Sequence, residues 1–213
     1  RVDDSVVTVL REQPYLIRRA RGYAPGQLRI PKTALPILGT GTQLKNTFCL
    51  ARDRYAFVSH FIGDLENQET LDSFEQAVAH YEKLFRIHPR ALACDMHPDY
   101  LATRYARARS QRESLPLIAV QHHHAHLAAC LAENAWESSA PAIGLIFDGT
   151  GYGTDGSIWG GEVLVGGYQG FERRFHLLPV PLPGGDLAVR KPARTALSWL
   201  AAAGIPAEEY QLP

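Results

Sequence analysis

The chain has 213 residues, and its 22 basic and 22 acidic side chains give a formal net charge of zero. A net basic field for nucleic acid is therefore absent, and no apolar run reaches the roughly 18 residues that a membrane span needs. The three cysteines, Cys49, Cys94 and Cys130, are far apart, which disfavours a zinc ribbon or a disulfide framework. We expect a reducing, cytoplasmic setting, with these cysteines in the core.

Residues 1–31 differ in pattern from the rest of the chain. Two short β-like runs, 5–10 and 14–18, lead into a basic string with turn-forming Pro and Gly residues behind it. This pattern indicates the end of one domain and a linker. The arginines of the string are either a solvated tail or a site for phosphate oxygens, which guanidinium groups bind in pairs. Because the sequence starts with Arg1 and not Met, we interpret it as a fragment of a longer protein.

From Leu35 onward, strand-like and helix-like segments alternate. An amphipathic helix is expected over 68–86, with Asn67 as its N-cap. Further helices are expected at 99–110, 122–133 and 188–203. Strands are expected at 36–39, 46–50, 55–61, 91–94, 115–120, 142–147, 157–165 and 173–178. Apolar strands that alternate with helices predict a buried, largely parallel α/β sheet.

Four of the nine histidines lie within five positions, at 122–124 and 126. On a helix, His122 and His126 share one face, and two imidazoles at that spacing can bind one divalent metal ion. The cluster follows an apolar strand, where open α/β sheets bind ligands. Position 123 is His, not the general-base Glu of a zinc protease. A His-rich helix start that is merely solvated is the alternative, but a nearby carboxylate, Asp148, favours a metal site.

Glycine-rich turns are the second signal. The stretch 148–156 comes after an apolar strand, and glycines there let backbone N–H groups approach phosphate oxygens. It fits neither the P-loop nor the Rossmann fingerprint; strand, acidic glycine loop and strand is the arrangement by which actin-like ATPases hold phosphates. Weaker glycine turns lie at 39–46 and 182–186. An ordinary hairpin, or a helix entry with Asp186 as N-cap, is the alternative.

Several motifs, taken in order, resemble the HypF family, the carbamoyltransferases of [NiFe]-hydrogenase maturation. They lie at 44–49, 62–66, 94–100, 122–126, 148–156, 159–162 and 183–186. The resemblance covers nearly the whole chain. It implies that residues 1–31 are the C-terminal end of a YrdC-like domain with its linker. It also implies that residues 32–213 are the N-terminal part of a Kae1-like domain, the first lobe of an actin-like ATPase fold of the α/β class.

The resemblance also implies an activity. Members of the family use ATP and carbamoyl phosphate to make carbamoyl adenylate. They pass the carbamoyl group to the C-terminal cysteine of the partner HypE, where dehydration gives the thiocyanate that becomes the cyanide ligands of the hydrogenase iron. The expected cofactors are ATP and a divalent metal ion, which the sequence leaves open as iron, zinc or magnesium. Neither nucleic acid nor a membrane is an expected partner.

The family pattern assigns roles to individual positions. His122, His126 and Asp148 fall on metal-binding, catalytic positions, and a further acidic ligand is expected beyond Pro213. Positions expected to face the nucleotide are Gly149, Thr150, Gly151, Gly153, Gly156, Gly184, Gly185 and Asp186. Arg18, Arg19 and Arg21 fall near the nucleotide pocket of the YrdC-like domain.

Two other functions compete with this interpretation. A tRNA threonylcarbamoyl transferase shares the Kae1 fold, but the balanced charge gives no support for an RNA surface. A lobe that only docks a partner is the second alternative. We expect the fragment to be inactive alone, because an actin-like cleft needs both lobes.

Overall fold

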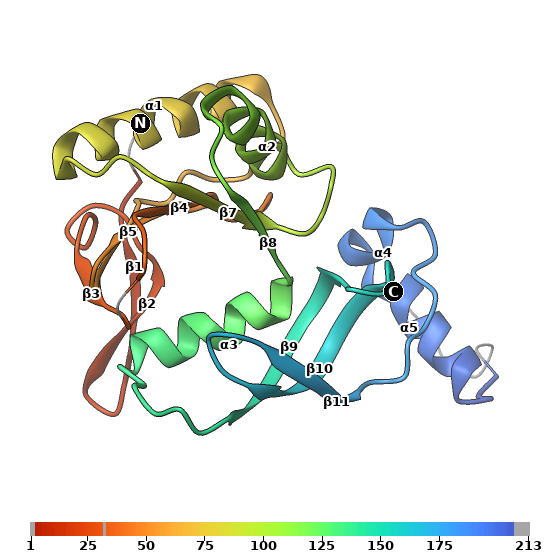
Figure 1. Cartoon of the computed structure of the whole chain (residues 1–213). Coiled ribbons are helices and arrows are strands. Elements are labelled where there is room, and N and C mark those ends of the chain that lie inside the picture. Colours follow the sequence, from red (N-terminus) through yellow and green to blue (C-terminus); the bar gives the residue numbers. More distant parts are fainter. Residues whose placement is uncertain (1–2, 32, 207–213) are drawn as a thin grey trace. The chain divides into compact units, whose positions relative to one another are not determined.

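The computed structural model describes residues 3–31 and 33–206, and the chain divides into two compact units between Phe175 and His176 (Figure 1). The first unit contains an N-terminal hairpin and two sheets. The second unit contains two helices. Within the described residues, no helix has the length and apolar character to cross a membrane.

The N-terminal segment is only partly separate from the rest of the first unit. The two predicted β-like runs are strands β1 (Val6–Leu10) and β2 (Gln13–Arg18), and they pair as an antiparallel hairpin. Strand β3 (Gln27–Arg29), however, pairs antiparallel with β6 (Tyr55–Val58) and is the edge of the next sheet. The domain boundary predicted between residues 31 and 32 stays a prediction, and residue 32 itself lies outside the described residues.

The six-stranded sheet has the order β3-β6-β5-β4-β7-β8 and is mixed, not largely parallel. Strand β7 (Ala91–Asp95) pairs in parallel with both of its neighbours, β4 (Ile37–Gly39) and β8 (Leu117–Val120). Strand β5 (Cys49–Arg52) is antiparallel to both β4 and β6. The sequence-based expectation was wrong here because no helix separates β4, β5 and β6. Only strands joined by long crossover connections can pair in parallel.

Two helices lie on one face of this sheet (Figure 1). They are α1 (Gln68–Phe85) and α2 (Leu101–Glu113), close to the predicted ranges. The predicted N-cap is confirmed, because the Asn67 side chain accepts a hydrogen bond from the Thr70 N–H at 2.8 Å. The apolar face of α1 packs into the main core, which includes Phe74 and Val78 from the helix and Leu38, Leu50 and Leu92 from the sheet.

The second sheet, β11-β10-β9, packs against α3 (His122–Glu133), which was also predicted (Figure 1). Its strands are β9 (Ala142–Tyr152), β10 (Ile158–Gly166) and β11 (Phe171–His176). A smaller core joins Leu127 and Leu131 of α3 to Ile146 and Leu164 of the sheet. Strand β9 runs past its predicted end at residue 147, because residues 151 and 152 pair with β10. The expected glycine loop is therefore shorter and begins near Gly153.

In the second unit, the predicted helix over 188–203 is two helices, α4 (Asp186–Arg190) and α5 (Pro192–Ala202). The break falls at Lys191 because Pro192 follows it. A proline inside a helix lacks the N–H donor and clashes with the preceding turn. Gly185, at φ +57°, is the N-cap of α4, so the alternative with Asp186 as cap was wrong. The side chain of Asp186 lies outside what the structure describes.

The cysteines differ in their surroundings. Cys94 is buried and Cys49 is half-buried, as a core role predicts, whereas Cys130 on α3 is exposed and was wrongly expected in the core.

Candidate metal centre

Helix α3 presents its histidines directly after strand β8. Gln121 caps the helix, and its side chain accepts a hydrogen bond from the His124 N–H at 2.9 Å. This cap fixes where the first turn begins. His122 stands at the start of the helix and His126 one turn later, on the same side.

Strand β9 carries Asp148 toward this helix through a bulge. Phe147 pairs with Gly161 and Gly151 pairs with Trp159, so residues 148–150 of β9 lie opposite Gly160 alone. Burial alternates along β9 up to residue 148 and resumes one residue out of step at 151. Bulges of this kind redirect side chains at functional sites. Here the bulge begins at the carboxylate that the sequence had marked as a ligand.

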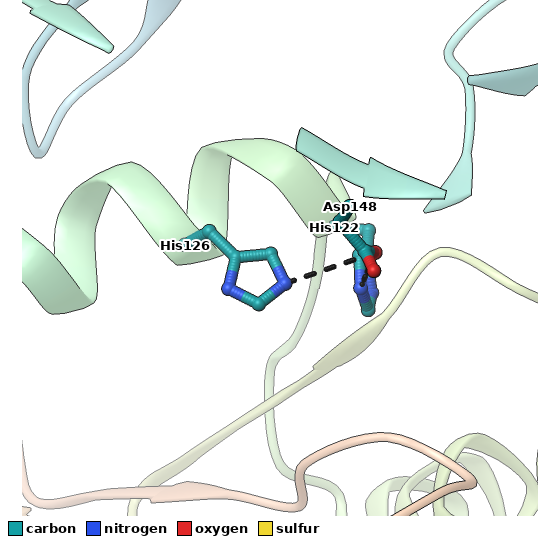
Figure 2. Close-up of side chains that lie close together, drawn as sticks. All are labelled: His122, His126 and Asp148. Atoms are coloured by element: carbon teal, nitrogen blue, oxygen red, sulfur yellow. Dashed lines mark ion pairs between the residues drawn. The ribbon is translucent and has the colours of Figure 1, made fainter. Parts of the chain in front are cut away.

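Three predicted ligands come together at this point (Figure 2). One ligand atom each from His122, His126 and Asp148 lies within 4.8 Å of the others. The Asp148 Oδ2 atom is 2.8 Å from His122 Nε2 and 3.8 Å from His126 Nε2. The sequence therefore identified three groups that are close enough to share one ion.

The donor set fits a divalent cation. Asp148 Oδ2 is buried but receives no hydrogen bond within the described part of the chain. Its 2.8 Å contact with His122 is an ion pair without the alignment that a hydrogen bond needs. A buried anionic oxygen needs a nearby cation; without a metal ion that cation is protonated His122, and a divalent ion can take the place of its proton. Two imidazoles and one carboxylate are also a common ligand set for zinc and iron, and they leave coordination positions open for substrate.

The charges of the three groups depend on one another. The Asp148 and Asp95 carboxylates raise the pKa of His122 to about 9, against the opposing effect of burial. In turn, His122 and then His126 hold the pKa of Asp148 well below its ordinary value. A metal ion that binds at His122 Nε2 must therefore displace a proton.

The other two histidines of the cluster support the site from the side. His123 is fully buried; its Nδ1 lies 3.1 Å from the Gln121 side-chain amide and its Nε2 lies 3.4 Å from the Asp148 carbonyl oxygen. The amide can only donate, so we assign the ring proton to Nε2, which donates to Asp148. Burial lowers the His123 pKa, which favours this neutral form. His124 Nε2 contacts the Gly167 carbonyl oxygen at 2.7 Å.

Sequence reasoning missed Asp95. This residue ends β7, its side chain is 3% exposed, and its Oδ2 atom lies 2.8 Å from His122 Nδ1. Asp95 belongs to the motif at 94–100 that carried the family resemblance, but no role was assigned to it. Its position at the C-terminal end of a parallel strand was the available signal, because ligands gather at that edge.

The glycines of the predicted phosphate loop fall into two groups. Gly151 and Gly153 are packed: a Cβ atom would lie 2.5 Å from the His123 ring at Gly151 and 2.1 Å from the Trp159 indole at Gly153. Gly149 has open space instead, and Gly156, at φ +78°, forms the turn between the strands. Thr150 is exposed. Contact of these residues with a nucleotide stays a prediction.

The remaining predicted nucleotide positions lie elsewhere. Gly184, at φ +88°, and Gly185 form the turn before α4 in the second unit. The arginines of the basic string have local contacts. Arg18 stacks over the Phe61 ring at 5.5 Å, Arg19 donates to the Tyr23 carbonyl oxygen and Arg21 pairs with Asp4 at 3.4 Å. Their predicted role in nucleotide binding is untested.

Comparison with known proteins gives consistent matches. Residues 32–133 match a family model described as the HypF Kae1-like domain, and residues 144–212 match one described as the second subdomain of a carbamoyltransferase Kae1-like domain. Carbamoyltransferase HypF of Rhodobacter capsulatus is 49% identical over 209 residues, which cover 96% of this chain and 28% of that protein. Carbamoyltransferase HypF2 of Cupriavidus necator is 46% identical over 96% of this chain and 25% of that protein.

A solved structure gives the same result. The crystal structure of full-length HypF in its phosphate- and nucleotide-bound form matches with a TM-score of 0.87 and 46% identity, over 94% of this chain and 26% of that one. The α/β, Kae1-like fold that the sequence predicted is therefore confirmed. The two family models divide at residues 133–144, inside the range 32–213 that was predicted as one part. The chain spans about a quarter of the length of these curated relatives.

Proposed function

Because this chain belongs to the HypF family of carbamoyltransferases, we propose that the protein transfers a carbamoyl group at the candidate metal centre. The full protein would use ATP and carbamoyl phosphate to form carbamoyl adenylate. The carbamoyl group would then pass to the C-terminal cysteine of HypE, for synthesis of the cyanide ligands of a hydrogenase. The observation that supports this proposal is the convergence of His122, His126 and Asp148 within 4.8 Å.

The three side chains would hold a single divalent ion. Such an ion, when bound, supplies a Lewis acid that polarises a carbonyl group and offsets the charge of a leaving phosphate. The two imidazoles favour iron or zinc over magnesium, which prefers oxygen ligands. Asp148 contributes one negative charge and the carboxylate oxygen that lacks a hydrogen bond. His123 holds the backbone of Asp148 from the other side, through the contact with its carbonyl oxygen.

The open part of the bulge is the place proposed for phosphate groups. Gly149 comes directly after Asp148 and has open space around it, and Thr150 is exposed. Backbone in such surroundings can approach phosphate oxygens closely. Gly151 and Gly153 pack closely against His123 and Trp159, which leaves no room for a Cβ atom at either position.

The chain's own cysteines are poor acceptors, which supports an acceptor from a partner. Burial raises the pKa of the Cys49 thiol to about 12 and also raises that of Cys94. The thiolate is the nucleophilic form, and both groups stay protonated at neutral pH. Cys130 is exposed and lies outside the group of ligands that converge.

A metal-content measurement tests the proposal. His122→Ala, prepared in the full-length protein, should retain little metal after dialysis and should lose carbamoyl transfer. His124→Ala is the matched control: it removes an imidazole from the same turn, but this ring contacts the Gly167 carbonyl oxygen and the Phe171 ring instead of the proposed ligands. This control should keep the wild-type metal stoichiometry. Metal content and carbamoyl transfer would be measured on the same preparations.

Two results would contradict the proposal. Metal stoichiometry in His122→Ala equal to that of the wild type would exclude the site. A wild-type protein that binds metal at this site but transfers no carbamoyl group from carbamoyl phosphate and ATP would point instead to a docking lobe.

A further inference from the structure

The contact between Asp95 and His122 links the six-stranded sheet to the candidate metal centre. His122 lies between two carboxylates: Asp95 Oδ2 is 2.8 Å from its Nδ1, and Asp148 Oδ2 is 2.8 Å from its Nε2. These nitrogens are on opposite sides of the ring, so they have different partners. The side chain of His122 is 14% exposed and that of Asp95 only 3%, so water does not replace either contact easily.

Asp95 is itself held in place by its neighbours. Its Oδ1 atom accepts a hydrogen bond from the His97 N–H at 2.8 Å, and its carbonyl oxygen accepts one from Thr103 Oγ1 at 3.2 Å. The residue also ends a strand that pairs on both sides, with β4 and β8. These contacts leave Oδ2 with a fixed position and direction. Asp95 is therefore a rigid acceptor for a proton on His122.

The position of that proton matters for metal binding. An imidazole binds a metal ion through a nitrogen that carries no proton, and the partner of the other nitrogen decides which one that is. The Asp95 carboxylate keeps a proton on Nδ1, so after Nε2 has released its own proton, the Nε2 lone pair is free for an ion on the side where Asp148 lies. His126 differs, because its side chain is 54% exposed and has no second carboxylate contact in the described ranges.

We propose that Asp95 is a positioning residue of the metal centre, which holds His122 in the ring orientation and tautomer that present Nε2 to the ion. The inference rests on the proposed function, since it requires that His122, His126 and Asp148 hold a metal. A carboxylate behind a metal-binding histidine raises the basicity of the ligand and fixes the ring. Loss of such a partner typically costs about 10- to 100-fold in metal affinity.

Asp95→Asn is the sharpest variant. Its amide oxygen can still accept the hydrogen bond from His97, so the loop after β7 keeps that contact, and only the anionic acceptor for His122 is lost. Asp99→Asn is the matched control. It removes one negative charge from the same loop, but Asp99 is 72% exposed and pairs with Arg104.

The test measures Zn²⁺ affinity in the full-length protein by competition with a chromophoric chelator, and the Co²⁺ absorption spectrum at saturating metal. Asp95→Asn should bind Zn²⁺ about 10- to 100-fold more weakly and change the Co²⁺ spectrum. Asp99→Asn should stay within about twofold of the wild type, because the charge it removes is exposed. Thermal unfolding in excess chelator reports whether each variant folds.

Three results separate the possibilities. A folded Asp95→Asn protein with wild-type Zn²⁺ affinity would overturn the role of Asp95, even if its melting temperature falls. Wild-type affinity in His122→Ala would overturn the proposed function itself. If Asp95→Asn does not fold, Asp95→Glu is compared with Asp95→Gln, which differ only in charge; equal Zn²⁺ affinity of that pair would overturn the inference.

Discussion

Two clusters of charged side chains in the first unit differ in how their charges are satisfied. In the cluster between α1 and α2, Arg109 pairs with Glu82 at 2.5 Å and with Glu113 at 3.0 Å, and donates to the Tyr105 hydroxyl at 3.2 Å. In the metal-centre cluster of His122, His126 and Asp148, one buried carboxylate oxygen has no hydrogen bond within the described residues. Both clusters join separate elements of the fold.

The difference separates a structural role from a functional one. A buried charge with a full set of partners has no capacity left for a ligand. Removal of one partner leaves the other charge buried and unpaired, which is costly. A buried oxygen that is held only by an ion pair with His122 can accept a metal ion once His122 releases its proton. We therefore expect changes in the Arg109 cluster to affect stability alone, and changes in the metal-centre cluster to affect metal binding.

The largest effect is expected from Arg109→Met. Glu82, whose side chain is only 16% exposed, would lose its cation, and breaking a buried pair costs about 3–5 kcal/mol. Denaturant unfolding measures the loss, and Zn²⁺ affinity of the folded variant should not change. Arg104→Met is the control on the same helix: this arginine is 60% exposed, and its loss should cost less than about 1 kcal/mol. Equal losses for the two variants would contradict the comparison.

Asp148→Asn should show the opposite behaviour. Loss of a direct ligand should weaken Zn²⁺ binding by at least roughly 100-fold, beyond the cost of losing an outer partner. The free energy of unfolding without metal should change by less than about 1 kcal/mol, because the side chain is 36% exposed. Asp155→Asn, on the same hairpin, should leave Zn²⁺ affinity unchanged. A stability loss in Asp148→Asn as large as in Arg109→Met would show that the cluster is structural.

The smallest effect distinguishes two glycines of the bulge region. At Gly151, an added Cβ atom would lie 2.5 Å from His123 Cε1 and 3.0 Å from His122 Cβ. Gly151→Ala should therefore destabilise the fold by about 1–3 kcal/mol and weaken Zn²⁺ binding, since α3 and β9 must separate. Gly149→Ala adds its methyl group in open space and should cost less than about 0.5 kcal/mol. Calorimetry measures the melting temperatures of both variants. Similar values would contradict the close packing of Gly151 against the two histidines.

Local patterns in the sequence predicted much of the fold and three neighbouring side chains. The capping residue Asn67 and the periodicity of α1 depend on residues a few positions apart, and the structure has both. The pair His122 and His126 also depends only on helical spacing. The link between Asp148 and these histidines is not local, because it joins a strand end to a helix distant in sequence. The resemblance of the motifs to the HypF family indicated it.

Features that depend on distant pairing were not predictable. Asp95 and His122 are 27 positions apart in the chain, and they meet only because β7 and β8 are parallel neighbours. The sheet is mixed because β4, β5 and β6 follow one another without a helix, which the alternating pattern of the sequence did not indicate. The bulge in β9 depends on the register with β10, which no local motif encodes.

The bulge in β9 also decides how Asp148 responds to a ligand that binds it. Pairing fixes residues 142–147 on one side and residues 151–152 on the other, so each end of the strand keeps its own register. The three residues between them face a single partner residue, so their backbone is less constrained than that of a regular ladder. Asp148 lies at the start of this bulge, so its carboxylate can shift toward a binding ion while the strand pairing on both sides is kept.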